Sequence, residues 1–166
     1  NIDISEGIQY KLGNISIEGE LGSLSEDDII SNLQIESGEI FNRNLVISDI
    51  QKLTDLFADQ GYAFVDINPV TSDFLDTINI NYIISLNKKV YVNRISIIGN
   101  SRTQDEVIRR EIGISEGGLY SRSDLRKSIL KLRRLGYFSN VEMEANKVEN
   151  MPDKIDLTFK VNETQT

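Results

Sequence analysis

The chain contains no cysteine and no histidine among its 166 residues. The absence of cysteine excludes disulfides, thiol nucleophiles and cysteine-based metal sites. The absence of histidine removes the commonest general base and the commonest metal ligand. Carboxylate, lysine, serine or tyrosine chemistry remains, but no EF-hand, His-Glu-x-x-His or Gly-x-Ser-x-Gly spacing occurs. We therefore expect no enzyme, no catalytic residue, no metal site and no cofactor.

Long apolar runs are missing as well. No run approaches the ~18 residues that a transmembrane helix needs. No signal peptide opens the chain, whose first residue is Asn1. A composition of 39% hydrophobic and 27% charged residues is typical of a globular protein rather than a disordered or membrane-spanning one. We expect the chain to be a piece of a longer protein.

What the chain does contain is one pattern that occurs twice. The matched landmarks keep their order, with offsets of 80, 79 and 75 residues: Gly19 with Gly99, Gly38 with Gly117, and Gly61 with Gly136. The smallest offset leaves the first copy four residues longer before its third landmark, which is about one helical turn. We therefore expect a longer second helix in the first copy. Two small tandem domains favour a binding scaffold over an enzyme.

Each copy has the order strand, helix, helix, strand, strand. The first strands are expected over residues 12–18 and 90–98, and the later pairs over 62–69 with 77–86 and 137–147 with 154–161. Capping boxes at Ser25–Asp28 and Thr103–Glu106 predict where the first helices begin. The second helices end at Gly61 and Gly136. The fold class is therefore α+β, with two tandem βααββ domains, each a three-stranded mixed sheet with two helices packed on one face.

Alternating apolar residues predict the cores. In the first copy we expect one cluster to be buried: Ile15, Ile17, Ile78, Ile80 and Tyr82 against Leu53 and Phe57. In the second copy Tyr137 and Phe138 are interpreted as core anchors. Pro69 cannot donate a ladder hydrogen bond, so its strand should be an edge. Four glycines are interpreted as backbone requirements: Gly19, Gly99, Gly117 and Gly136.

The net charge of −8 conceals an asymmetry between the copies. Residues 1–86 hold 3 basic and 15 acidic residues, a net −12, whereas residues 87–166 hold 15 basic and 11 acidic residues, a net +4. Either the copies meet different neighbours or their solvated faces have drifted. The basic second helix of the second copy could face anionic lipid headgroups or simply solvent. A nucleic-acid or anionic-surface binding module is the alternative of another class, but the pI of 4.6 argues against nucleic acid.

Taken together, these motifs resemble the polypeptide-transport-associated (POTRA) domains of the Omp85 family over essentially the whole chain. The resemblance depends on four segments: the strand ending in Gly99-Asn100, Gly117–Tyr120, the run from Leu132 to Phe138, and the closing strand from Phe159 to Glu163. It implies domains at 10–87 and 88–166, with residues 1–9 the end of a preceding module. Within the family, the chain is most similar to the last two modules of an outer-membrane protein assembly factor. Two-partner secretion and translocation-assembly transporters are the alternatives.

The resemblance also implies a location and partners. We expect the periplasmic region of a cell outer-membrane protein, continuous with a C-terminal membrane β-barrel. The partners would be unfolded outer-membrane protein precursors and accessory outer-membrane lipoproteins, with no nucleic acid. Precursor strands could add to the edges at Val65-Asp66-Ile67 and Val141-Glu142-Met143 by β-augmentation; the alternative is an edge guarded by Asp66, Pro69 and Glu142. Lipoprotein docking is expected at Arg109-Arg110-Glu111, which could instead be a solvated helix face.

Overall fold

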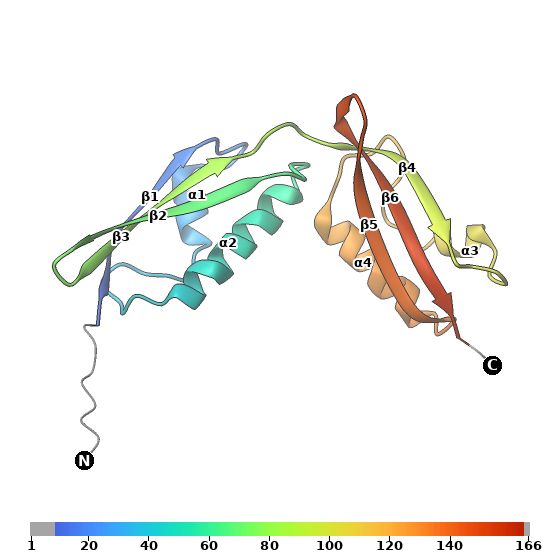
Figure 1. The fold of residues 1–166 in the computed structure, drawn as a ribbon, viewed down its shortest axis with the longest axis horizontal. Coiled ribbons are helices and arrows are strands. Elements are labelled where there is room, and N and C mark those ends of the chain that lie inside the picture. Colours follow the sequence, from blue (N-terminus) through green and yellow to red (C-terminus); the bar gives the residue numbers. More distant parts are fainter. Residues whose placement is uncertain (1–8, 165–166) are drawn as a thin grey trace, which may run out of the picture. The chain divides into compact units, whose positions relative to one another are not determined.

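The computed structural model describes residues 9–164 of the chain. Contacts divide the chain into two compact units, which Figure 1 shows as two separate sheets with their helices. Unit 1 comprises the residues up to Leu56 together with Val65–Leu86. Unit 2 comprises Phe57–Phe64 and the residues from Asn87 onward. The segment Phe57–Phe64 therefore belongs to unit 2 by its contacts, although it precedes Val65–Leu86 in the sequence.

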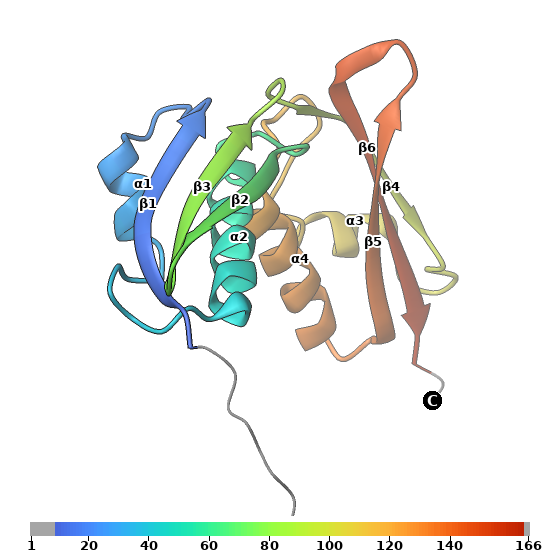
Figure 2. The same cartoon turned by 60° about the vertical axis from the view of Figure 1, so that its left-hand side comes forward.

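Unit 1 has the predicted βααββ order. Its elements are β1 (Lys11–Gly19), α1 (Glu26–Ser31), α2 (Arg43–Ala58, whose last two residues belong to unit 2), β2 (Asp66–Phe74) and β3 (Thr77–Ser85). The strand order is β1-β3-β2, with β1 parallel and β2 antiparallel to β3. This is the expected mixed sheet. Figure 2 shows α1 and α2 on one face of it.

The central strand β3 provides most of the buried sheet surface of unit 1. Ile80, Tyr82 and Ile84 are each at most 2% exposed, as are Leu53 and Phe57 on α2. The expected burial of Ile15, Ile17 and Ile78 was wrong, because all three are only partly buried. Ile15 and Ile17 lie on β1, which is an edge strand, and the helix α1 that follows it has only six residues. Ile78 lies near the start of β3, before its fully buried residues begin at Ile80.

Unit 2 repeats this architecture. Its elements are β4 (Tyr91–Ile98), α3 (Asp105–Arg109), α4 (Arg122–Arg134), β5 (Phe138–Val148) and β6 (Met151–Glu163), in the strand order β4-β6-β5. Its core holds residues from every strand together with Ile108 on α3 and Leu125 and Leu132 on α4. Ala58 is fully buried in the same core, and Ala63 and Phe64 pack against it. Helix α4 has 13 residues and α2 has 16, so the expected longer second helix of the first copy is confirmed.

Both first strands end in a glycine with positive φ. Gly19 has a φ of +104° and Gly99 has a φ of +91°. A Cβ atom at Gly19 would collide with the carbonyl oxygen of Ile84, and one at Gly99 would collide with that of Val161. Any other residue would therefore meet both backbone strain and a steric clash. Gly117 and Gly136 also have positive φ.

The first helices begin differently in the two units. In unit 1 the capping box is confirmed: the Asp28 amide donates to the Ser25 hydroxyl and the Ser25 amide donates to the Asp28 carboxylate. The Ser25 hydroxyl also donates to Asp28, and these bonds lower the pKa of that carboxyl. The expected box at Thr103–Glu106 was wrong, because the N-cap of α3 is Gln104, without a side-chain cap.

A carboxylate at the end of β6 holds the loop before α3 in place of the missing capping box. Glu163 at the end of β6 accepts the amides of Arg102 and Thr103 and the Ser101 hydroxyl, at 2.7–3.1 Å. The Thr103 amide is the largest of the causes that lower the pKa of Glu163 to about 2. The loop before α3 is therefore fixed from a position 60 residues away in the sequence.

Other expectations in the second copy need correction. Phe138 is 7% exposed, as a core anchor should be, but Tyr137 is 54% exposed. Tyr137 follows the positive-φ turn at Gly136 and precedes β5, so its ring lies outside the sheet, edge-on to the ring of Phe138. In the first copy, β2 begins at Asp66 rather than Tyr62, because the Tyr62 amide still bonds the Phe57 carbonyl at the end of α2.

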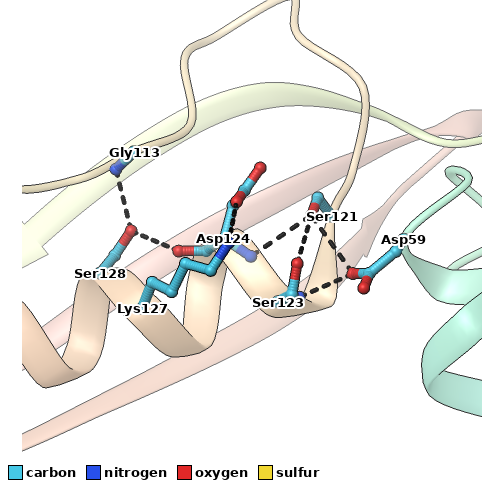
Figure 3. A network of polar contacts seen from close by, with 7 residues as sticks. All are labelled: Asp59, Gly113, Ser121, Ser123, Asp124, Lys127 and Ser128. Carbon is cyan, nitrogen blue, oxygen red and sulfur yellow. Dashed lines mark hydrogen bonds and ion pairs between the residues drawn. The ribbon is translucent and has the colours of Figure 1, made fainter.

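One buried polar position occurs in both units. In unit 1 the Asp49 carboxylate on α2 is fully buried and accepts the amides of Gln34 and Ile35 at 2.8 and 3.1 Å. In unit 2 the equivalent residue, 79 positions later, is Ser128, whose hydroxyl accepts the Gly113 amide at 2.9 Å (Figure 3). Each side chain therefore ties the loop after the first helix to the second helix.

Candidate partner-binding surfaces

The edge strand β2 carries the first predicted client site. Asp66 and Ile67 are in the strand, whereas Val65 precedes it. Asp66 is exposed and Ile67 is 8% exposed. Only the backbone of β2 could therefore bind an added strand here, because its apolar side chain is already committed to the core.

Pro69 indicates which backbone groups of β2 point outward. Pro69 pairs with Tyr82 in an unbroken antiparallel register. Because proline has no N–H, it is accommodated where that group would face the open side of an edge strand. Outward and inward groups alternate along an antiparallel strand. The outward positions are therefore Ile67, Pro69, Thr71 and Asp73, of which three keep a donor.

The second predicted client site lies on β5, which is also an edge strand. Val141 is fully buried, Glu142 is exposed and Met143 is partly buried. The guanidinium of Arg133 on α4 donates to the Val141 carbonyl at 3.0 Å. A side chain of the protein therefore already occupies the backbone acceptor in the middle of this site.

The edge strand β4 is guarded in a similar way. The Arg109 guanidinium donates to the Ile95 carbonyl at 3.0 Å, and the Ile95 amide donates to the Glu116 carboxylate at 2.8 Å. Arg109 also forms an ion pair with Asp105 at 3.6 Å. Arg109 was predicted as a docking residue, but its guanidinium covers a strand edge of its own unit. Beside it lies a hollow of about 310 Å³ lined by Ile95, Arg109, Ile112, Ile114, Ser115 and Glu116.

The other two predicted docking residues lie just beyond α3. Arg110 is the C-cap residue and Glu111 follows it. Their side chains form an ion pair at 3.6 Å and are 67% and 26% exposed. Of the three predicted docking residues, Arg110 is therefore the most exposed, while Glu111 is largely covered. Because the Arg110 side chain is mostly in solvent, this ion pair contributes about 0–1 kcal/mol, so a partner could replace it at small cost.

The basic face of α4 is partly used within its own unit. Besides the bond from Arg133 to Val141, Lys127 forms an ion pair with Asp124 at 3.4 Å. Six cations lie on this helix: Arg122, Arg126, Lys127, Lys131, Arg133 and Arg134. Part of this charge therefore stabilises the helix and guards β5.

Sequence reasoning missed the residues that decide which edges are open. Arg133 lies on the second helix of the second copy, which was expected to face lipid headgroups or solvent, and nothing in its spacing indicates that it reaches β5. The equivalence of Asp49 and Ser128 could have been found from the 79-residue offset, had polar positions been aligned as well as glycines.

Two kinds of feature bear on function in the part of the chain that the structure describes: metal sites and membrane-spanning helices. Residues 9–164 hold no group of three or more Asp or Glu side chains placed to bind a metal ion. None of the helices in that range is both long enough and apolar enough to cross a membrane.

Comparison with known proteins gives consistent matches. The chain is 34% identical over 169 residues to the outer membrane protein assembly factor BamA of Nitratidesulfovibrio vulgaris and 30% identical over 167 residues to that of Neisseria meningitidis serogroup B. These alignments cover 98% and 99% of this chain but 21% of each relative. The chain thus spans about a fifth of the length of these relatives.

Solved structures agree on the fold. The crystal structure of Haemophilus influenzae BamA POTRA3-5 matches with a TM-score of 0.85 at 24% identity, over 95% of this chain and 63% of that one. BamA from Haemophilus ducreyi lacking POTRA domains 1-3 matches with a TM-score of 0.82 at 26% identity, over 95% of this chain and 30% of that one.

The family model POTRA, described as surface antigen variable number repeat, matches twice, at residues 10–85 and 90–164. Each match covers one βααββ copy. The chain therefore belongs to the POTRA family, as two tandem POTRA domains like those that form the periplasmic part of the outer-membrane protein BamA.

Proposed function

We propose that this chain is the part of an outer-membrane protein assembly factor that receives unfolded precursors and docks accessory lipoproteins, without catalysing a reaction. The single observation that carries the proposal is the difference between the strand edges. Side chains of the protein occupy backbone groups on β4 and β5, whereas the outward side of β2 keeps donors at Ile67, Thr71 and Asp73. Support for the assembly role comes from the relatives named above, which are assembly factors.

The chemistry of an open edge suits many clients. A strand added to β2 would be held by main-chain hydrogen bonds, which do not depend on the client's sequence. The exposed side chains of β2 are mixed: Asp66 and Asp73 are acidic, whereas Val70 and Phe74 are apolar. The strand therefore presents no single side-chain chemistry that a client would have to match. A precursor that will form strands in the membrane has the required backbone. Of the two predicted client sites, we therefore assign the β2 edge as the receptor.

The test is a matched pair of proline substitutions. Thr71→Pro removes an outward donor from β2, and Ala145→Pro removes one from the equivalent side of β5. A peptide copying one strand of an outer-membrane protein is titrated while amide NMR shifts are recorded. We expect shifts at Ile67, Thr71 and Asp73 and roughly tenfold weaker binding for Thr71→Pro, about 1.4 kcal/mol for lost main-chain bonds. Shifts confined to loops, or equal losses in both variants, would contradict the assignment.

Lipoprotein docking is proposed at Arg110 and Glu111, next to the hollow beside Arg109. Glu111→Lys would place two cations where an ion pair now lies, so a partner that pairs with Glu111 would be repelled. We expect at least tenfold weaker binding of a purified accessory lipoprotein from the same organism, measured by surface plasmon resonance. Lys127→Glu on α4 is the control and should change binding little. Unchanged affinity for Glu111→Lys would refute this docking site.

A further inference from the structure

The strands β1 and β4 are equivalent edge strands, and each lies beside an equivalent hollow. Ile15 pairs with Ile80 of β3 just as Ile95 pairs with Leu157 of β6. The hollow beside β1 has a volume of about 480 Å³ and the one beside β4 about 310 Å³. Each residue that lines the hollow in unit 2 has a counterpart that lines the hollow in unit 1, 79 or 80 positions earlier in the sequence: Ile15, Ile30, Leu33, Ile35, Glu36 and Ser37.

In unit 2 two charged side chains occupy the outward backbone groups of β4 at this point. The Arg109 guanidinium donates to the Ile95 carbonyl, and the Glu116 carboxylate accepts the Ile95 amide. The same residue thus receives one donor and one acceptor. A residue of an added antiparallel strand supplies the same pair of groups when it lies directly opposite in a hydrogen-bonded pair. The two side chains therefore take the place that an added strand would have on β4.

Unit 1 has neither of these charged side chains. The positions of Arg109 and Glu116 are taken by Ile30 and Ser37. The isoleucine side chain has no donor, and within residues 9–164 the Ser37 hydroxyl makes no hydrogen bond to Ile15. Because Ile15 has the same place in its sheet as Ile95, its amide and carbonyl also point away from the central strand. The β1 edge therefore offers a donor and an acceptor beside the larger hollow.

We infer that β1 and the hollow beside it bind an extended segment of a partner protein that carries one large apolar side chain between basic residues. One residue of this segment would donate its N–H to the Ile15 carbonyl and accept the Ile15 amide. Because residues directly opposite each other on paired strands project to the same face, its side chain would enter the hollow. Ile30, Leu33 and Ile35 give the hollow an apolar lining, which a large apolar side chain fits best.

Charge indicates which residues flank the apolar side chain of the segment. Glu36 lines the hollow and is exposed, and residues 1–86 carry a net charge of −12. Basic residues on either side of the apolar one would therefore be attracted to this edge. The β1 site would select its ligand by a side chain, whereas the β2 edge proposed for clients would bind through its backbone. The two sites are separate, and this inference does not depend on client binding at β2.

The test compares two synthetic peptides with blocked ends, Lys-Thr-Lys-Leu-Lys-Thr-Lys and the same peptide with serine in place of leucine. Each is titrated into the isotope-labelled chain at about 0.15 M salt while amide NMR shifts are recorded. Because the peptides carry equal charge, their difference in affinity reports the hollow. We expect shifts at Ile15, Ile30 and Ile35, and about tenfold tighter binding of the leucine peptide. Equal affinities would overturn the inference. Shifts at Ile67 and Thr71 without shifts at Ile15 would support the β2 site but would also overturn this one.

Transferring the charged pair of unit 2 to unit 1 should close the site. The double variant Ile30→Arg with Ser37→Glu should abolish the shifts at Ile15. The control, Asn44→Glu with Ile47→Arg, adds the same two charges at exposed positions of α2 outside the hollow and should leave binding unchanged. If the first variant does not fold, Ser37→Glu alone, at an exposed position, should weaken the leucine peptide about fivefold, because an amide that already has an acceptor cannot donate to the peptide. Undiminished binding by the folded variant, or equal losses in variant and control, would overturn the inference.

Discussion

At the residue scale, equivalent positions of the two units solve the same problem with different side chains. Tyr82 in unit 1 corresponds to Phe159 in unit 2, and both are fully buried. The Tyr82 hydroxyl has no hydrogen-bond partner among the described residues. Burial, and secondarily the charge of Asp49, raises the pKa of this hydroxyl above its ordinary value. Unit 1 thus buries a hydroxyl group that the equivalent residue of unit 2 lacks.

Removing that hydroxyl should stabilise the protein. We expect Tyr82→Phe to raise the free energy of unfolding by about 1 kcal/mol, because a buried group without a partner costs about 1–3 kcal/mol. Urea denaturation followed by circular dichroism measures the change. The reciprocal variant Phe159→Tyr serves as the control and should destabilise the protein. A Tyr82→Phe protein that is less stable than the wild type would mean that the hydroxyl has a partner.

The sequence predicted some features of single residues well and others not at all. Glycines that need positive φ, such as Gly19 and Gly99, are visible because no other residue satisfies the backbone there. Long-range side-chain bonds are invisible, since the reach of Arg133 to Val141 depends on the angle between α4 and the sheet. The exposed position of Tyr137 was likewise not predictable from its hydrophobicity.

At the element scale, the order and type of strands and helices followed from periodicity, whereas their ends depended on local bonds. Alternation identified β3 and β6 because each is the central strand of its sheet, with alternate side chains buried along most of its length. The start of β2 was misplaced by four residues, because Tyr62 is still bonded to the end of α2. The two first helices had similar starting sequences but only one formed the box.

The two helix starts predict different responses to alanine. Ser25→Ala should lower the free energy of unfolding by about 1 kcal/mol, the usual effect of losing an N-cap side chain. Gln104→Ala should change it by less than about 0.5 kcal/mol, as surface substitutions away from such features do, because the side chain of Gln104, the N-cap residue of α3, makes no capping hydrogen bond. Thermal unfolding of both variants gives the comparison. Equal losses would show that the Gln104 side chain caps α3 in solution.

At the scale of the whole molecule, the internal repeat carried most of the predictive power. Three glycine landmarks at nearly constant offsets indicated two βααββ units, and the family match covers both. The division of the chain into two units by contacts could not be predicted from the repeat. Residues Phe57–Phe64 belong to unit 2 through Gly61 and Asp59, and these bonds involve residues about 30 to 60 positions later in the sequence.

The hydrogen bonds from Glu163 to the loop before α3 predict that the stability of the protein falls in acid. Because the folded protein lowers the pKa of Glu163 to about 2, its carboxylate contributes stability above the ordinary value of 4.5, and that contribution is lost as the pH falls toward 2. We expect Glu163→Gln to be less stable than the wild type near pH 6 and to differ little from it near pH 2, as chemical denaturation would measure. Glu142→Gln is the exposed control. An unchanged difference across this range would contradict the assignment.

Pro69 distinguishes a foreign strand from another copy of the same protein. When two copies of β2 meet antiparallel and symmetrically, each contributes its proline, so the ladder lacks two donors. A client strand that lacks proline meets one missing donor only. The net −12 of residues 1–86 adds repulsion between identical copies, which a neutral or basic precursor does not experience. An edge that can pair with a client strand therefore disfavours pairing with a second copy of the same protein.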